Sequence, residues 1–509
     1  MSPILIVIGL VLLATVCYDL VQRKHAILRN FPVIGHFRYW LEAVGPELRQ
    51  YIVTDNNEER PFSRDQRSWV YASSKLENNY FGFGSDNEQE SSPNYQIIKH
   101  AAFPLIAPNP GDPGYDPSYA IPCAKVLGGF RDRARAFRPA SVINVSGMSY
   151  GSLSGVAIEA LGMGSKLAGC FQNTGEGGLS PFHARGGADL VFQVGTGYFG
   201  CRGEDGRFAM SRLKALIDAY PQVKAIEIKL SQGAKPGVGG VLPKKKITPE
   251  IAAIRGISNA HDCISPAAHT AFRDADSLLD FAEHVATETG LPVGIKSAVG
   301  EMRFWQDLAR LTASTGRSLD FITVDGGEGG TGAGPLVFAD RVGLPFKVAF
   351  SRVQRVFAEH ELHDRIVFVG SGRLGFPEAA ILGFALGCDL INVGREGLLA
   401  IGCIQALRCH TNRCPTGITT QNAWLTRGLD PTLKSVRAAN YIVTLRKELL
   451  ALSRACGVSH PSMVAPHQIE ILDDRFGART VADLLGGRGR GLAFDAEPGA
   501  TDPARTIPS

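Results

Sequence analysis

Residues 366–375 (IVFVGSGRLG) and 390–397 (LINVGREG) share one pattern, in which a short apolar run ends in a glycine loop that carries an arginine. Six earlier apolar runs also end in glycine-bearing or polar loops, with helical patterns between them. Eight such units within about 250 residues predict a (β/α)8 TIM barrel of the α/β class. A doubly wound open sheet is the alternative, because alternation alone fixes only the class. The six earlier strands are expected at residues 142–145, 169–172, 190–194, 225–229, 293–296 and 321–324.

The composition is that of a globular protein with ample material for a core. The 509 residues include 53 Lys and Arg against 49 Asp and Glu, and 44% are hydrophobic. This balance excludes a chain disordered throughout, a collagen, a coiled coil and a polytopic membrane protein. The two signs of charge are intermixed, so no nucleic-acid partner is expected. Glycine is in excess, with 58 residues, which indicates tight turns or loops that approach a ligand closely.

The N-terminus carries the signal of a membrane anchor. Residues 1–18 have no charged side chain, and Asp19, Arg23 and Lys24 follow. A spanning helix needs about 20 apolar residues, with a range down to about 17. We therefore predict a single transmembrane helix in the cell inner or plasma membrane, with the catalytic domain on the cytoplasmic side, where the basic residues lie. A buried or interfacial helix is the alternative.

The remaining sequence divides by composition and pattern. The wide gap between Lys229 and Val293 indicates an inserted loop or subdomain in the barrel. We expect an anchor at 1–20, an irregular capping segment at 21–139, the barrel with the cysteine-rich segment at 140–425, a helical extension at 426–485 and a disordered tail at 486–509.

The loops after the last two strands have the form of a phosphate cradle. Gly372, Arg373, Gly394 and Arg395 would let backbone N–H groups and guanidinium groups converge on an anion. Lys296 ends an apolar strand, which would point its ammonium group at the mouth of the barrel. There it would favour the anionic reduced form of a flavin. Alternatively, its side chain merely passes the rim on its way to solvent.

A second cationic group suits a small dicarboxylate. Lys229 and Gln232 are followed by Lys235 and, farther along, by Arg255. Arginine binds a carboxylate through two parallel hydrogen bonds, and lysine acts as a point charge. Glu176, in a glycine loop, could orient a substrate or guard a channel. The run 244–246 (KKK) is expected to be solvated on the surface.

Three of the ten cysteines form a distinct block. Cys403, Cys409 and Cys414 follow the pattern Cys-x5-Cys-x4-Cys and precede a proline. Three close thiolates favour a soft metal or a cluster, and disulfides are not expected on the cytoplasmic side. Zinc with His410 as a fourth ligand is open, but His410 adjoins Cys409, and adjacent residues rarely both reach one metal. A three-iron cluster is the better interpretation.

The sequence blocks together resemble the FMN-binding domain of glutamate synthase. The blocks GMSYGSLS (147–154), NTGEGG (173–178), EIKLSQGAKPGVGG (227–240), DGGEGGTGAG (325–334) and GCIQALRCHTNRCPTGITTQ (402–421) occur in the order found in that family. The resemblance covers residues 147–421. It implies a TIM barrel with FMN and a [3Fe-4S] cluster, in which 2-oxoglutarate and ammonia condense to 2-iminoglutarate, and reduced FMN converts this to L-glutamate.

The resemblance also implies roles for particular residues. Cys403, Cys409 and Cys414 would ligate the cluster. Lys229, Gln232 and Arg255 would hold the oxoacid, and Glu176 would line the site where ammonia arrives. FMN would contact Met148, Ser149, Gln193, Lys296, Gly326, Gly372, Arg373, Gly394 and Arg395.

Two departures from the family bear on the substrates. We find neither the glutaminase domain that begins the full enzyme nor its β-helical C-terminal domain, so we expect external ammonia, a separate glutaminase or another amine donor. We recognise no Rossmann unit for NAD(P)H, so we expect a protein electron donor, such as ferredoxin or a reductase subunit. Three alternatives stay open: an FMN enzyme for another oxo or imino acid, a nucleotide dehydrogenase with a catalytic thiol near Cys263, and a non-catalytic membrane-anchored scaffold.

Overall fold

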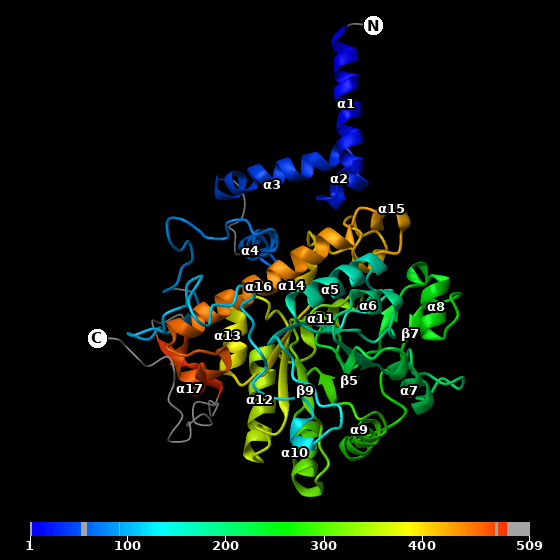
Figure 1. The fold of residues 1–509 in the computed structure, drawn as a ribbon, viewed down its shortest axis with the longest axis vertical. Helices are drawn as coiled ribbons and strands as arrows, with labels where there is room; N and C mark the ends of the chain where they lie inside the picture. The colour runs from blue at the N-terminus through cyan, green and yellow to red at the C-terminus, as the bar shows by residue number, and fades with distance from the viewer. Residues whose placement is uncertain (1–2, 52–58, 91, 474–476, 486–509) are drawn as a thin grey trace.

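The chain forms a closed barrel of eight parallel strands, surrounded by helices (Figure 1). The computed structural model describes residues 3–51, 59–90, 92–473 and 477–485. Closure confirms the (β/α)8 prediction and excludes the open sheet, and each of the eight predicted apolar runs contains or overlaps a strand. Around the barrel, the strands are β2 (Ile143–Val145), β3 (Gln172–Asn173), β4 (Leu190–Val194), β5 (Val223–Lys229), β8 (Val293–Ser297), β9 (Phe321–Asp325), β10 (Val367–Ser371) and β11 (Leu390–Val393).

Helices between the strands cover the outside of the barrel. Their ends follow ordinary capping chemistry: the Ser154 hydroxyl accepts from the Ala157 N–H at the start of α5, and Gly169 ends that helix in the left-handed region at φ 68°. These helices are α5 (Gly155–Ala168), α6 (Pro181–Gly186), α7 (Met210–Ala219), α9 (Ala275–Thr289), α10 (Arg303–Thr315), α11 (Leu336–Arg341), α12 (Phe346–Glu359), α13 (Pro377–Ala385) and α14 (Arg395–Ala400).

The insertion predicted between Lys229 and Val293 is present. It contains the hairpin of β6 (Val241–Leu242) and β7 (Cys263–Ile264), a 3-10 turn at Lys244–Lys246 and helix α8 (Pro249–Arg255). Helix α8 ends at Gly256, whose φ of 62° favours glycine. The insertion therefore carries Arg255 at the last turn of a short helix.

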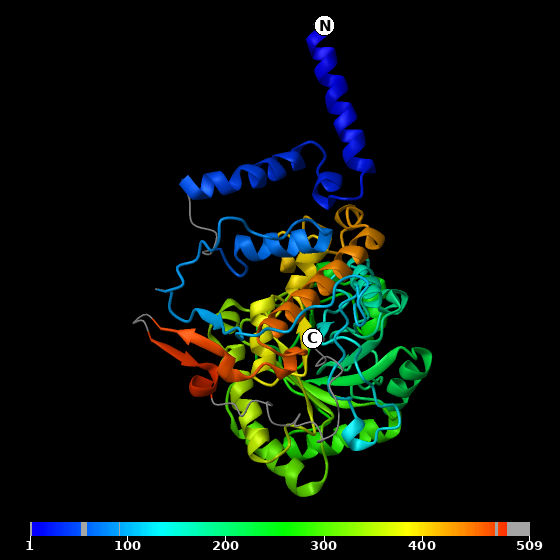
Figure 2. The same cartoon turned by 60° about the vertical axis from the view of Figure 1, so that its left-hand side comes forward.

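The segment before the barrel is more regular than the sequence indicated. It contains helices α1 (Pro3–Val21), α2 (Ala26–Asn30), α3 (Ile34–Tyr51) and α4 (Arg64–Lys75), strand β1 (Gln96–Ile98) and a 3-10 turn at Gly129–Arg131. In the described part of the chain, α1 alone is long and apolar enough to cross a membrane, by length and composition only. Figure 2 shows α1 projecting away from the barrel, with α3 crosswise at its foot.

The segment after the barrel combines a long helix with a small sheet. Helix α16 (Pro431–Ala455) follows the 3-10 turn Cys409–Thr411 and the short helix α15 (Ala423–Thr426). Strands β12 (Ile469–Leu472) and β13 (Ala478–Thr480) then form an antiparallel sheet with β1, before α17 (Val481–Leu485). The predicted helical extension at 426–485 is thus only partly helical. Its strands β12 and β13 form a sheet with β1, which comes from the segment before the barrel. The expected tail at 486–509 lies outside the described residues.

Helix α16 packs against α5 at a point where only glycine fits. A Cβ added to Gly164 would lie 2.6 Å from the Cβ of Ala438 and 2.8 Å from the carbonyl oxygen of Ser435. Backbone and Cβ atoms cannot move aside as the end of a flexible side chain can. The absence of a side chain at Gly164 therefore sets the distance between the two helices.

We predict that Gly164→Ala destabilises the protein by about 1–3 kcal/mol through overpacking. Helix propensity alone predicts a gain of about 1 kcal/mol from the same change. Gly397→Ala in α14 is the control, since its added methyl group meets only the Leu161 Cδ2 atom at 3.7 Å. Urea unfolding of the three proteins measures the difference, and a stabilised Gly164→Ala protein would contradict the packing argument.

Candidate active site

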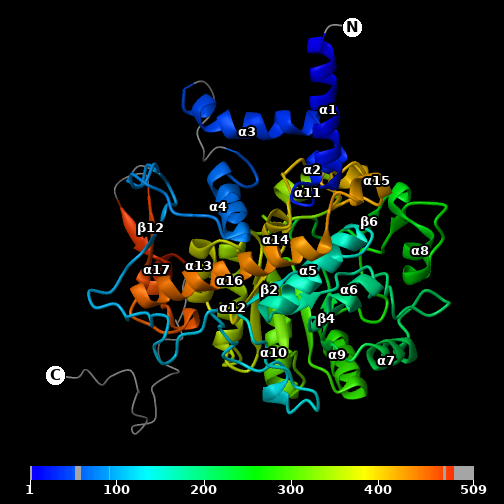
Figure 3. The same cartoon turned by 45° about the horizontal axis from the view of Figure 1, so that its top comes forward.

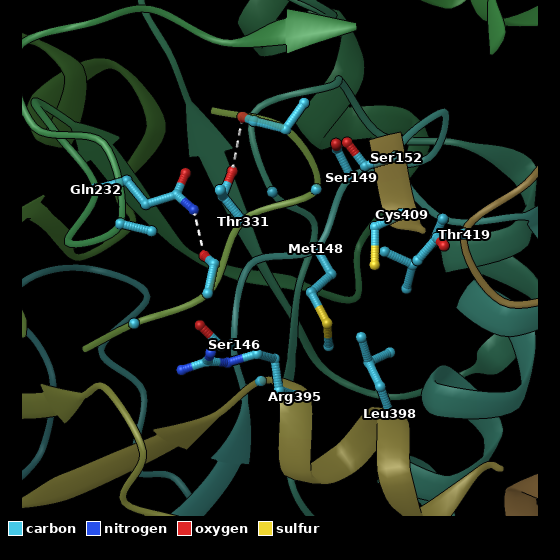
Figure 4. Close-up of a pocket in the computed structure, with 18 of the residues that line it drawn as sticks. Ser146, Met148, Ser149, Ser152, Gln232, Thr331, Arg395, Leu398, Cys409 and Thr419 are labelled. Carbon is cyan, nitrogen blue, oxygen red and sulfur yellow. Dashed lines mark hydrogen bonds between the residues drawn. The ribbon is translucent and has the colours of Figure 1, made fainter. Parts of the chain in front are cut away.

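A large cavity opens at the carboxyl ends of the barrel strands, where the parallel register brings the strand ends together. In this register Lys229 pairs with Lys296, and Ser371 pairs with Asp325. The cavity has a volume of about 350 Å3, within the range of small-molecule sites. Figure 4 shows Gln232, Met148, Arg395 and Cys409 around it. Of the residues expected in the site, all but Gly326 line it; Gly326 lies behind Gly372, whose added Cβ would come within 3.1 Å of the Gly326 nitrogen.

Glu176 lies in a cationic part of this cavity. Its Oε1 atom is 2.7 Å from the Nζ atom of Lys229, and the same Nζ atom donates to the Gln232 Oε1 atom at 3.0 Å. Gln232 in turn donates to the carbonyl oxygen of Gly330 at 2.6 Å (Figure 4). Burial would raise the pKa of Glu176, but Lys229, Lys235 and Arg255 lower it to about 2. Glu176 is therefore a carboxylate at every physiological pH.

Two further cations complete this part of the cavity. Lys235 is buried, and burial lowers its pKa, while Glu176 opposes that shift. Arg255 is also buried; its Nη2 atom donates to the Tyr150 carbonyl oxygen at 3.1 Å, and its guanidinium group lies over the Phe199 ring. The Arg255 Nε atom is buried and has no protein hydrogen-bond partner. Three cations against one carboxylate leave a surplus of positive charge suited to an anion.

Beneath the cavity, a buried carboxylate joins four strands. Glu227 on β5 accepts hydrogen bonds from Asn173 on β3, Gln193 on β4 and Thr323 on β9, at 2.8, 2.7 and 2.7 Å. It is 1% exposed. Sequence analysis did not single it out, although a charged residue inside the apolar run AIEIK is a usable signal. A buried carboxyl group needs such donors. Glu227 therefore holds the side chain of Gln193 in place at the bottom of the cavity.

Glycine loops and two arginines form the opposite wall. Gly372 has φ 121°, a conformation that favours glycine, and Arg395 donates to the carbonyl oxygen of Glu328. The guanidinium groups of Arg373 and Arg395 lie 5.4 and 5.1 Å from the ring centroid of Phe62. Phe62 is 2% exposed and comes from the segment before the barrel. Sequence analysis missed it, because no local pattern links residue 62 to the loops after β10 and β11.

Lys296 lines the cavity near the end of β8. It is 6% exposed, and its Nζ atom is 3.6 Å from the Asp325 Oδ2 atom. The same Oδ2 atom accepts a hydrogen bond from the Gly233 N–H at 2.8 Å. Lys296 is thus a buried cation held by a carboxylate and does not extend past the rim to solvent.

The three cysteines line the same cavity on the side of α14. Burial raises the pKa of Cys403 to about 12. Burial would also raise the pKa of Cys414, but hydrogen bonds with Thr416 and Thr419 lower it. Among the described residues, no group of three His, Cys, Asp or Glu side chains is close enough to hold one metal ion. Thiolates that bind different irons of a cluster need not converge on one point, so this arrangement is compatible with a cluster.

The expectation that residues 244–246 are solvated on the surface is wrong for Lys246. Its side chain is 2% exposed and donates to the carbonyl oxygens of Ser152 and Cys409, at 2.6 and 3.3 Å. Burial lowers its pKa to about 8, while Cys409 and Cys414 oppose that shift. The hairpin of the insertion folds back onto the cysteine segment, which a run of three lysines does not reveal.

Comparison with known proteins gives relatives over most of the chain. The conserved region in glutamate synthase matches residues 131–459. The glutamate synthase large subunit-like protein YerD of Bacillus subtilis is 37% identical over 470 residues, covering 86% of this chain and 88% of YerD. The archaeal glutamate synthase (NADPH) of Methanocaldococcus jannaschii is 35% identical over 322 residues, covering 62% of this chain and 59% of that protein.

A closed parallel barrel with a charged, glycine-walled mouth defines a (β/α)8 enzyme. The family match and the length of the YerD alignment identify it further. The chain belongs to the glutamate synthase family, and it is an oxidoreductase of the class that acts on CH–NH2 donors.

The pKa of Glu176 yields a pH prediction. A folded pKa of about 2 lies below the ordinary value of about 4.3, so ionisation of this group stabilises the folded protein above about pH 4.3. That contribution is lost as the pH falls toward 2. We expect Glu176→Gln to cost about 1–3 kcal/mol at pH 7. The difference from the unaltered protein should be constant down to about pH 5 and shrink below it. Urea unfolding at pH 7, 6, 5 and 4 measures this difference, and one that grows on acidification would contradict the pairing.

Proposed function

We propose that the chain catalyses reductive amination of 2-oxoglutarate to L-glutamate, with FMN as the hydride donor and externally supplied ammonia. One observation carries this proposal: Lys229, Lys235 and Arg255 surround a single carboxylate in the cavity that the glycine and arginine loops also line. The balanced reaction joins 2-oxoglutarate, ammonium, two electrons and two protons to give L-glutamate and water. It breaks the C=O bond of the oxoacid, whose oxygen leaves as water, and forms one C–N bond and one C–H bond at the same carbon.

The wall formed by the glycine loops and the two arginines fits FMN. Gly372 and Gly394 leave the backbone open to a phosphate, and Arg373 and Arg395 supply charge at the same place. Lys296, Gln193, Met148 and Ser149 line the same cavity and would contact FMN, and Gly326 would support the loop from behind Gly372. When bound, FMN supplies the hydride. The ammonium group of Lys296 would stabilise negative charge on the reduced ring.

The cationic part of the cavity would bind the oxoacid. Arg255 and Lys229 would hold its carboxylates, and Gln232 would orient it from the Gly330 side. Glu176 would attract and orient ammonium next to the reacting carbonyl carbon, because its low pKa keeps it anionic. Lys229 would then exchange its contact with Glu176 for one with the substrate.

The remaining partners follow from the chain's own features. Cys403, Cys409 and Cys414 border the cavity and fit thiolate ligands of a [3Fe-4S] cluster, through which a protein donor such as ferredoxin or a reductase subunit would deliver electrons. A separate glutaminase could supply the ammonia. Helix α1 would cross the inner or plasma membrane once and hold the barrel on its cytoplasmic side.

The test is an anaerobic absorbance spectrum of the detergent-purified full chain. Dithionite should bleach a flavin band, and addition of 2-oxoglutarate with ammonia should restore it as L-glutamate forms. Arg255→Ala should retain the flavin band but reoxidise at least about tenfold more slowly at the same oxoacid concentration, since a lost charged contact of about 1.4 kcal/mol is tenfold. A bleached band that does not return would indicate another oxo or imino acid. Absence of flavin would support a scaffold.

A separate prediction addresses the cluster. Cys409→Ser should lower the iron content and remove the visible absorbance that iron–thiolate centres add to the flavin spectrum, because serine replaces a thiolate ligand. Cys456→Ser is the matched control, since Cys456 does not line the cavity. Iron analysis of both purified variants measures the effect. Unchanged iron in Cys409→Ser would rule out the assignment of that cysteine.

A further inference from the structure

Helix α3 presents an apolar face to solvent. Phe37 and Trp40 are 61% and 57% exposed, and their rings stack with centroids 5.8 Å apart. Ile34 and Leu41 are also exposed, and residues 34, 37 and 41 follow the i, i+3, i+7 spacing of one helical face. Soluble proteins rarely expose such contiguous apolar surface without a partner.

The other side of α3 faces the protein. Tyr39 is partly buried, with its ring 4.9 Å from the His25 ring in an edge-to-face arrangement. Arg437 of α16 influences the pKa of Tyr39, although burial is the larger cause and raises it. Gly35 packs directly on Leu28 of α2. Because Gly35 and Tyr39 are four residues apart, they define an inward face, and the apolar face lies opposite.

The foot of α1 is fastened to the start of α3. The Asp19 side chain is fully buried; its Oδ2 atom accepts from the Val33 N–H at 2.9 Å, and its Oδ1 atom is 2.8 Å from the His36 Nε2 atom. These contacts fix the direction in which α1 leaves α3. Figures 1, 2 and 3 show α3 extending crosswise from the lower part of α1, which is the end nearer the barrel.

Cations gather at the same level of the molecule. Arg23 and Lys24 follow α1 directly and are exposed, and Arg29 and Arg38 lie on α2 and α3. Glu42 pairs with Arg38 at 2.7 Å and Asp430 pairs with Arg23 at 3.3 Å, so among the described residues of this region Lys24 and Arg29 carry most of the positive charge that is left to attract an anion. Basic residues next to a membrane segment are attracted to anionic headgroups by about 1 kcal/mol each.

We propose that α3 lies in the headgroup region of the membrane that α1 crosses, with Phe37 and Trp40 in contact with lipid. The inference rests on the anchoring role proposed above for α1. An amphipathic helix with aromatic residues on one face and cations nearby suits a bilayer surface. Helices α1 and α3 both expose apolar side chains, and the contacts of Asp19 with Val33 and His36 hold the two helices together, so a bilayer would cover both. The barrel would then be held at a fixed distance and orientation below the membrane.

The test uses the full chain in vesicles of phosphatidylcholine and phosphatidylglycerol, with and without brominated acyl chains. Subtracting the fluorescence of Trp40→Phe from that of the unaltered protein isolates Trp40. We expect bromolipid to quench this difference signal by at least half and aqueous acrylamide to quench it only weakly. Trp305→Phe is the matched control: Trp305 is 1% exposed in the barrel, and neither quencher should affect its signal.

Three results would overturn the proposal for α3, and they differ in what they say about the anchor. Quenching of Trp40 by acrylamide and not by bromolipid, while the protein floats with the vesicles, overturns the role of α3 and leaves the anchor standing. Shielding from both quenchers also overturns it, in favour of a second copy or another protein on this face. Failure to float overturns α3 and the anchor together. Glutamate formation is measured in the same preparation, so the catalytic proposal succeeds or fails independently.

Discussion

The structure depends on satisfying the hydrogen bonds of one carboxyl group buried inside the barrel. Glu227 is surrounded by strands, and hydrogen bonds from Asn173, Gln193 and Thr323 offset the cost of removing it from water. These donors come from strands that are neighbours of β5 and from strands that are not, so the contacts tie together opposite sides of the barrel. The hydrogen bonds to Glu227 also help to set the shape of the cavity above it, because Gln193 donates to Glu227 and lines that cavity.

Much of the barrel was predictable because its strands are buried on both faces. Residues 366–369 are apolar throughout and residues 390–393 are apolar except for Asn392, and the loops after them must meet at one end of a closed parallel sheet. The grouping of Lys229, Lys296 and Gly372 follows from that geometry alone. The prediction needed no contact between distant residues, only the end of each strand.

The residues that sequence analysis missed depend on contacts distant in sequence. Phe62 reaches the arginines of the loops after β10 and β11, and Lys246 reaches the cysteine segment because a hairpin folds back. Neither residue differs locally from an ordinary loop phenylalanine or a surface lysine. Similarly, β1 finds its partner strand only at residues 469–471. The irregular appearance of residues 21–139 in the sequence reflects this reliance on partners elsewhere.

The segment before the barrel also holds the cysteine block from two sides. The Tyr71 hydroxyl donates to the Cys403 carbonyl oxygen at 2.7 Å, and the Asn30 amide donates to the carbonyl oxygens of Pro415 and Leu425. More than 330 residues separate the partners in each case. During synthesis, residues 26–75 therefore emerge from the ribosome long before their partners exist. At about 5–20 residues per second, the first part of the chain waits on the order of half a minute, with its apolar helices uncovered, for the last part to arrive.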